Sequence, residues 1–143
     1  MPNINAIIST LSKIHGSANK IIISELKSHN LEGLVPSHGD ILILLYEKED
    51  GIPMSQISQK IGKDKSTVTA LINKLEGLGL LEKLKNEKDS RSTLIKLTKK
   101  GLLTKPIVID RISKKLLDRA YTNFTEEEKK VLCTLLEKMN ENF

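Results

Sequence analysis

Apolar residues recur at steps of three and four along most of this chain, the spacing that places side chains on one face of an α-helix. The first series predicts one long amphipathic helix over about residues 4–29. A second helix is expected to begin at Pro36, because proline suits the first helical position, and to run to about Lys48. Asp50-Gly51 then marks a turn.

The middle of the chain shows two helices separated by a very short connection. A short helix is predicted over about Met54–Ile61, and Gly62 ends it. A further helix begins at Lys63 or Asp64 and ends near residues 77–79. About three residues separate the two helices, which is the spacing of a helix-turn-helix.

A polar segment between two short apolar runs follows this pair of helices. Residues 80–85 and 93–97 are predicted to be strands, and residues 86–92 are predicted to be the loop that joins them. The loop is too long for a tight two-residue turn. The pattern therefore predicts a β-hairpin with an extended tip, directly after the helix-turn-helix.

Two more helices are expected in the last third of the chain. Thr98 is a suitable N-cap for the first of them. Pro106 lies inside that helix and should kink it. Thr125 and Glu128 stand three residues apart and form a capping-box signature for the last helix, which runs toward Phe143.

These elements predict a mainly α fold with a small two-stranded β wing. Residues 35–98 form the expected winged helix-turn-helix domain. Residues 1–34 and residues 99–143 supply the N-terminal helix and the C-terminal helices on either side of it, within one structural unit. The expected fold class is a winged helix-turn-helix flanked by dimerisation helices.

The two end segments carry apolar stripes that the winged domain does not need for its own core. A second copy of the chain is the simplest partner for those stripes, which predicts a homodimer. Such a dimer would place two equivalent helices about 34–36 Å apart, one turn of DNA. The alternative is that all stripes are buried within one chain.

The helix after Gly62 has an apolar stripe and an opposite face of short or amide-bearing side chains. Short polar groups let a helix backbone approach the floor of the major groove, and asparagine can pair with adenine through two hydrogen bonds. Lysines suit phosphates. The simpler interpretation is a solvated helix face. The candidate major-groove residues are Lys65, Ser66, Thr67, Thr69, Ala70, Asn73 and Lys74.

Positive charge is concentrated on the hairpin and the start of the next helix. Residues 83–100 hold seven lysines and arginines against two acidic residues, a surplus equal to the net charge of +5 for the whole chain. This concentration suits phosphate contact, and Arg91 is the candidate for the minor groove. Lys85 and Lys88 are further wing candidates, and Asp89 should support the wing by an ion pair or turn cap. The alternative is an ordinary charged loop.

Four short segments resemble the MarR family of regulators, and the order of helices fits that family over nearly the whole chain. The most specific part is the Asp-x-Arg sequence of the wing, followed at short distance by Leu-Thr-x-x-Gly. The segments are Asp64-Lys65-Ser66-Thr67-Val68-Thr69, Leu75-Glu76-Gly77-Leu78-Gly79-Leu80, Asp89-Ser90-Arg91-Ser92 and Leu97-Thr98-Lys99-Lys100-Gly101.

The resemblance implies a transcriptional regulator that binds a pseudo-palindromic double-stranded DNA operator as a homodimer. It also implies that a small-molecule effector releases the DNA, as in a ligand-responsive repressor. It assigns Arg91 to the minor groove, Asp89 to a supporting salt bridge in the wing, and residues 65–73 to the major groove.

The chain departs from the family pattern at two positions. Val35 precedes Pro36 where the family often has threonine or serine, so the second helix lacks a side-chain cap. Pro106 interrupts the helix that should link the wing to the dimer interface, which puts the straightness of that helix in doubt.

Histidine and cysteine provide weaker signals. His15 and His38 are candidates for lining an effector pocket where the helical arms meet the winged domain, although such histidines are more often partly exposed polar residues. Some family members sense oxidants through a cysteine in the first helix, and none stands there. Cys133, the single cysteine, is expected to be a buried structural residue of the last helix.

The cysteine content and the lack of targeting or membrane-spanning segments bear on where in the cell the protein is located. A single cysteine excludes an intrachain disulfide, which fits a reducing cytosol. The first residues lack the basic and apolar regions of a signal peptide. The longest apolar run, Ile41–Tyr46, is far shorter than the roughly 20 residues of a membrane helix. We expect a soluble, cytoplasmic protein without membrane contact.

The motifs also narrow the function. The sequence has no glycine-rich phosphate loop, nucleophile elbow, catalytic carboxylate pair or metal-ligand spacing, which argues against an enzyme, a cofactor and a metal site. The alternative to DNA binding is a winged-helix module for protein–protein contact. An apolar recognition face would favour that alternative, whereas Lys65, Lys74 and the charged wing argue against it.

Overall fold

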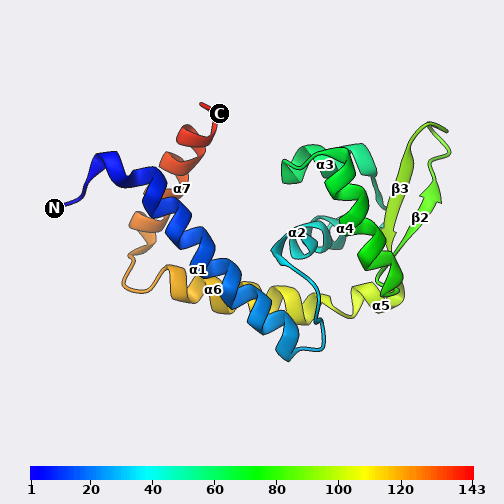
Figure 1. Ribbon diagram of the computed structural model, residues 1–143, viewed down its shortest axis with the longest axis horizontal. Helices are drawn as coiled ribbons and strands as arrows, with labels where there is room; N and C mark the ends of the chain where they lie inside the picture. The colour runs from blue at the N-terminus through cyan, green and yellow to red at the C-terminus, as the bar shows by residue number, and fades with distance from the viewer.

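The computed structural model describes residues 1–143 as a winged domain joined to an extended helical arm (Figure 1). Both chain termini lie at the arm end, and the wing projects at the opposite end. The fold is mainly helical with a small antiparallel sheet, as predicted. In chain order the elements are η1 (Ile4–Ala6), α1 (Ile7–Ser28), α2 (Pro36–Tyr46), β1 (Ile52–Pro53), α3 (Met54–Ile61), α4 (Lys65–Gly77), β2 (Leu81–Lys85), β3 (Thr93–Leu97), α5 (Lys99–Leu102), η2 (Pro106–Ser113), α6 (Lys114–Ala120) and α7 (Glu126–Asn140).

The turn between α3 and α4 is bounded by the two residues that predicted it from the sequence, Gly62 and Asp64. Gly62 ends α3 in the left-handed conformation, with φ of 67°, which glycine adopts without the steric cost of a Cβ. Asp64 then caps α4 by accepting a hydrogen bond from the Thr67 amide. The short connection between α3 and α4 is therefore built from a glycine stop and an aspartate start.

The sheet has three strands rather than two, in the order β1-β3-β2, and all neighbours are antiparallel. The hairpin β2–β3 pairs Leu81 with Leu97 at its base and Lys85 with Thr93 toward its tip. The two residues of β1 are too few to show an alternating pattern, so this strand had no signal in the sequence. Ile52 pairs with Ile95 and anchors the chain between α2 and α3 to the wing.

The core lies almost wholly in the winged domain. Seventeen buried apolar residues form one cluster, and all of them except Leu26, Val108 and Ile112 lie between Leu34 and Leu97. The three exceptions come from the end of α1 and from η2, so these segments dock the arm against the domain. The winged domain therefore has a core of its own.

The segment from Thr98 to Gly101 joins the wing to α5. The Thr98 hydroxyl donates to the Gly79 carbonyl at 2.5 Å and accepts from the Gly101 amide at 3.1 Å. Gly101 packs so closely against the end of the α4–β2 connection that a Cβ would overlap the Leu80 carbonyl oxygen. The Leu-Thr-x-x-Gly segment, residues 97–101, thus holds the end of the wing against the α4–β2 connection, and we call it the clasp. Its glycine is required because the two backbones approach so closely.

The helix expected around Pro106 is not continuous, which corrects the prediction of one kinked helix. α5 ends at Leu102, a turn follows, and the helix that resumes is π-helical through η2 before it becomes α6. Pro106 has no N–H with which to continue the helical ladder across this junction. The buried Thr104 hydroxyl lies in the turn, 2.6 Å from the Tyr46 hydroxyl, and fixes it against α2.

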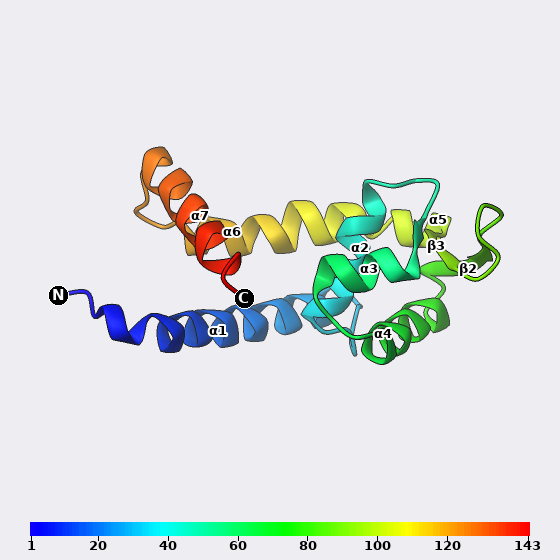
Figure 2. The ribbon, with the colours of Figure 1, turned by 90° about the horizontal axis from the view of Figure 1, so that it is seen from above.

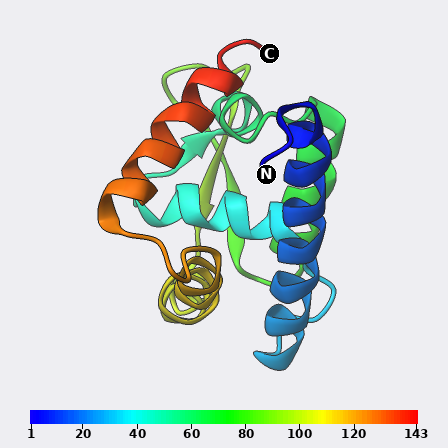
Figure 3. The ribbon, with the colours of Figure 1, turned by 90° about the vertical axis from the view of Figure 1, so that its left-hand side faces the viewer.

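The arm is formed by α1, η2, α6 and α7. Figure 2 shows α1 and the η2–α6 helix extending alongside each other away from the winged domain, and Figure 3 shows α7 on the opposite side of the arm from α1. An ion pair between Glu25 and Lys115 joins α1 to α6. Apart from Leu26, no residue of α1 or α7 is buried. No helix of the structure is both long enough and apolar enough to cross a bilayer.

Cys133 is exposed in this chain, which corrects the expectation of a buried cysteine. Its sulfur lies 3.4 Å from the Tyr121 hydroxyl at the end of α6. The prediction rested on the position of Cys133 between Leu132 and Leu135, but no residue of α7 is buried within the single chain.

Candidate nucleic-acid interface

The start of α4 is organised by Asp64. Its carboxylate accepts from the Thr67 amide at 2.8 Å and from the Ser66 hydroxyl at 2.9 Å. These hydrogen bonds, the Thr67 amide foremost, hold the pKa of Asp64 below its usual range, so the carboxylate stays ionised. The Ser66 proton is thereby used inside the chain, while the Ser66 oxygen can still accept a hydrogen bond.

The exposed face of α4 carries the side chains that the sequence singled out. Val68, Ile72 and Leu75 are buried, and the opposite face is solvent-exposed. Thr69 is half-buried at the edge of that face, and its hydroxyl donates to the Lys65 carbonyl at 2.8 Å. The exposed predicted residues are Lys65, Ser66, Thr67, Ala70, Asn73 and Lys74.

Asn73 is linked to the wing by a residue that the sequence did not single out. The Lys83 ammonium, on β2, donates to the Asn73 side-chain oxygen at 2.5 Å and lies 3.5 Å from the Glu76 carboxylate. The Asn73 oxygen is therefore occupied, and its amide nitrogen remains as a donor. Lys83 was counted only as part of the wing charge, because sequence spacing does not show which strand residue faces α4.

Lys74 lies on the other flank of α4. Its ammonium approaches the connection between α1 and α2, where a Cβ on Gly33 would lie 3.3 Å from it. Its charge also lies close enough to His38 to help lower the pKa of that histidine. Asn73 and Lys74 are adjacent in sequence, yet one is tied to the wing and the other lies beside the opposite edge of the domain.

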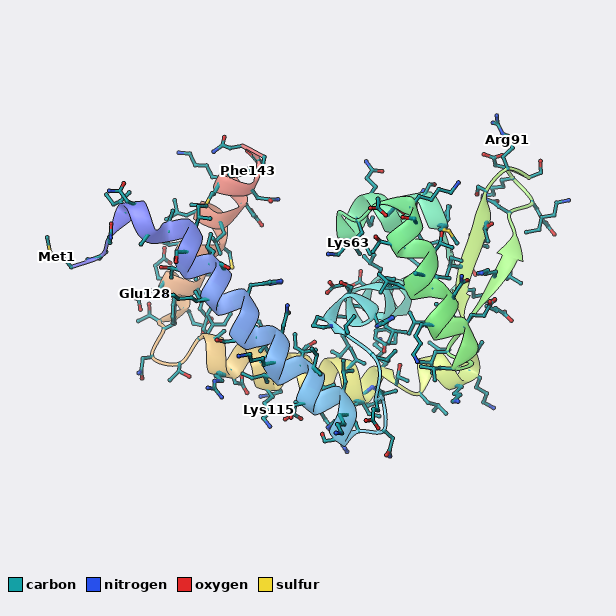
Figure 4. All side chains as sticks on the ribbon, in the orientation of Figure 1. Met1, Lys63, Arg91, Lys115, Glu128 and Phe143 are labelled. Atoms are coloured by element: carbon teal, nitrogen blue, oxygen red, sulfur yellow. The ribbon has the colours of Figure 1, made fainter.

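The wing tip is shaped by two side chains that accept from the backbone. Asp89 accepts from the Arg91 amide at 3.0 Å and from the Arg91 Nε at 3.4 Å. Asn86 accepts from the Lys88 amide and donates to the Ser92 hydroxyl at 2.9 Å. Arg91 is 91% exposed and points away from the body of the molecule (Figure 4). Lys85 and Lys88 are also exposed.

The two histidines proposed for an effector pocket lie in different environments. His38 is 5% exposed, and its Nδ1 accepts from the Val35 amide at 2.9 Å. It thus caps α2 from the third helical position, which compensates for the missing cap at Val35. Burial lowers the pKa of His38, which favours the neutral acceptor form. His15 is exposed on α1, 3.2 Å from the Asn19 side chain.

The family model that matches this sequence is that of the MarR family, over residues 34–93. A similar curated protein is the HTH-type transcriptional regulator MhqR of Bacillus subtilis (strain 168). It is 30% identical over 133 residues, which cover 92% of this chain and 88% of that protein.

Two solved structures share the fold. The MarR protein from Peptoclostridium difficile DA00132 superposes with a TM-score of 0.85 at 28% identity, covering 96% of this chain and 86% of that one. A mutant MarR from E. coli, complexed with operator DNA, superposes with a TM-score of 0.81 at 18% identity, covering 96% of this chain and 99% of that one. At that lower identity the second structure supports the fold alone.

Proposed function

Because this chain belongs to the MarR family, whose similar curated members are transcriptional regulators, we propose that it is a sequence-specific DNA-binding regulator. The observation that carries the proposal is the common position of two cationic elements. Lys65, at the start of α4, and Arg91, at the wing tip, line one cavity on the same side of the domain. A duplex can therefore meet the exposed face of α4 and the wing at once.

The chemistry of this surface divides into base and phosphate contacts. Ser66, Thr67, Ala70 and the free amide of Asn73 are short enough to reach base edges from a helix in the major groove. The lysines of α4 and the wing, Lys65, Lys74, Lys85 and Lys88, provide charge for phosphates. Arg91 enters the adjacent minor groove, with Asp89 holding its backbone.

The regulator acts as a homodimer on a pseudo-palindromic operator. Support comes from the arm, where large apolar side chains remain exposed in the single chain. A two-fold related copy would cover these faces and would present two α4 helices to successive turns of DNA. The exposed apolar residues of the arm helices include Ile7, Ile8, Ile14, Ile23, Leu117, Val131, Leu132, Leu135 and Leu136. Residues 1–34 and 99–143 are thus the dimerisation segments around the winged domain, 35–98.

Repression relieved by a small effector is the regulatory mode that we propose from family membership. The expected site is the junction of arm and winged domain, near His15 and His38. A panel of small aromatic acids and other metabolites should contain one that raises the melting temperature and weakens operator binding. If every compound leaves both quantities unchanged, this chain does not respond to ligands of that kind.

The DNA-binding proposal is tested by selecting bound sites from random duplexes with the purified protein. Arg91→Ala should then weaken binding to the selected site by about 1–3 kcal/mol, with unchanged melting temperature, since its side chain is exposed. Lys130→Ala on α7 removes the same charge far from the wing and should leave affinity unchanged. Failure to enrich any sequence, together with a flat salt dependence, would contradict the proposal and favour a protein-binding module.

A further inference from the structure

A cavity of about 300 Å³ lies between α3, the start of α4 and the wing. It is built by the two consecutive helices of the helix-turn-helix and by the wing. Six of its seven lining residues have polar or charged side chains, and Met54 is the apolar one. The lining residues are Met54, Ser55, Ser58, Lys65, Arg91, Ser92 and Thr93.

Most hydrogen-bond donors around this cavity are not used within the chain. Lys65 forms no ion pair, and Arg91 is engaged only through its Nε, which leaves the terminal guanidinium nitrogens free. The hydroxyls of Ser55, Ser58 and Thr93 form no side-chain hydrogen bond within the chain, so their protons are available. The Ser92 hydroxyl accepts from Asn86, so its own proton also remains free to donate.

Two cations and several free hydroxyl protons around a small cavity match the chemistry of a phosphate group. Phosphate oxygens accept hydrogen bonds and carry negative charge, and arginine and lysine are the side chains that bind them. No acidic residue lines the cavity, and the Asp89 carboxylate already accepts hydrogen bonds from Arg91.

The position of the cavity identifies the source of the phosphate. A major groove and the adjacent minor groove are separated by one sugar–phosphate strand. If α4 lies in the first groove and the wing tip in the second, that strand must pass between them, where the cavity lies.

We propose that this cavity seats a backbone phosphodiester of the DNA strand that runs between α4 and the wing. Ser55 and Ser58 of α3 and Ser92 and Thr93 of the wing donate to it, together with Lys65, while Arg91 borders the cavity and extends into the minor groove. The inference rests on the proposed DNA-binding function and adds hydroxyl contacts that sequence reasoning did not single out. Such a contact fixes the register of the protein on DNA and carries no base information.

The test uses duplexes of the selected site in which single phosphates are replaced by neutral methylphosphonates. One position in each half-site, between the α4 contacts and the wing contacts, should weaken binding of the unmodified protein by about tenfold or more. Ser58→Ala should weaken binding to ordinary DNA by about threefold to tenfold, equally on selected and unrelated sequences. Lys65→Ala should also reduce the steepness of the salt dependence by about one counterion per chain.

The decisive result is non-additivity. The Ser58→Ala and Lys65→Ala proteins should bind the duplex with a methylphosphonate at this position almost as well as the unmodified protein does. Each substitution removes the same interaction that the neutral methylphosphonate has already removed. Ser9→Ala on α1 and Lys130→Ala on α7 are matched controls, because both side chains are exposed on the polar faces of their helices, opposite the apolar side chains proposed for the dimer interface. Both variants should bind every duplex as the unmodified protein does.

Additive losses, or no sensitive phosphate between the two contact regions, would overturn the phosphate seat. That failure is distinct from failure of the proposed function, because unmodified protein would still bind the selected site and Arg91→Ala would still weaken it. Titration with inorganic phosphate distinguishes a free anion as occupant. If inorganic phosphate shifts the amide resonances of Ser58 and Ser92 at sub-millimolar concentration, while methylphosphonate substitution in the duplex leaves DNA affinity unchanged, the cavity binds a free anion and not the DNA backbone.

Discussion

In the winged domain Ile41, Ile57 and Ile72 are fully buried, whereas on α7 Leu135 keeps 56% of its surface exposed. Both regions have helices with apolar stripes. They differ in whether other elements of the same chain pack against those stripes. In the winged domain α2, α3, α4 and the sheet cover one another. In the arm α7 lies on the opposite side from α1, and neither closes over the other (Figure 3).

The difference shows that an apolar stripe in a sequence predicts that the face is buried, but does not tell whether the same chain or a partner buries it. Exposed apolar side chains in such a number mark a surface that a partner covers. The winged domain should therefore keep its stability when the arm is altered, while the arm should gain its stability from association. Four changes test this contrast, from the largest expected effect to the smallest.

Removing a core side chain of the winged domain should have the largest effect. Ile41→Ala should lower the free energy of unfolding by about 2–5 kcal/mol, because it removes a fully buried side chain and leaves a cavity. Urea denaturation at fixed protein concentration measures the loss. Leu135→Ala is the matched change in the arm, and its loss should shrink on dilution as the dimer dissociates. Equal, concentration-independent losses would contradict the contrast.

Gly101→Ala should destabilise the winged domain through a backbone clash. A Cβ at this position overlaps the Leu80 carbonyl oxygen, so the clasp at Thr98 must open, at a cost of about 3 kcal/mol. Gly39→Ala is the control, because it places a Cβ in open space on the helix α2 and should be neutral or stabilising by about 0.5–1 kcal/mol. A Gly101→Ala protein as stable as the parent would show that the clasp does not limit stability.

A charge on the arm should separate association from folding. Leu135→Glu should shift sedimentation from dimer to monomer, because it introduces a carboxylate into the surface proposed to be covered by a second copy. The melting temperature measured under dilute, monomeric conditions should change little. Lys138→Glu, a charge change on the same helix, should leave the dimer in place. A Leu135→Glu protein that stays dimeric would place the interface elsewhere.

The smallest effect should come from His38. Burial holds its pKa below 6.5 in the folded chain, so the unfolded chain binds the proton more readily. The contribution of neutral His38 is complete above about pH 6.5 and is lost as the pH falls toward the folded-state value. Unfolding measured between pH 7 and pH 5 should show this loss.

Two variants isolate that effect. His38→Gln keeps an acceptor for the Val35 amide without a titrating ring, so its stability should fall less steeply with acid. His15→Gln changes an exposed histidine and should keep the slope of the parent. If His38→Gln loses stability with acid as steeply as the parent, another group carries the pH dependence.

Much of the fold followed from local chemistry. Gly62, Asp64, Thr98 and Thr125 predicted the ends of helices, because caps and left-handed stops act within a few residues. What could not be predicted depends on residues far apart in sequence. β1 exists because Ile52 meets Ile95, and the break before η2 is fixed against α2 by Thr104.

The candidate site divides in the same way. The α4 side chains and the wing charges were visible as a pattern. The contact of Lys83 with Asn73 and the position of Lys74 near Gly33 were not. Ser55, Ser58 and Thr93 carried no signal, because a serine or threonine gains meaning only from the cations that folding brings beside it.

The sequence by itself determined the order of elements, the polar face of α4 and the concentration of charge on the wing, because each depends on spacing along the chain. Only the tertiary structure decided which cations remain free and which hydroxyls gather beside them. It also decided which apolar faces stay open. Those outcomes depend on distances through space, which the packing of the whole chain sets.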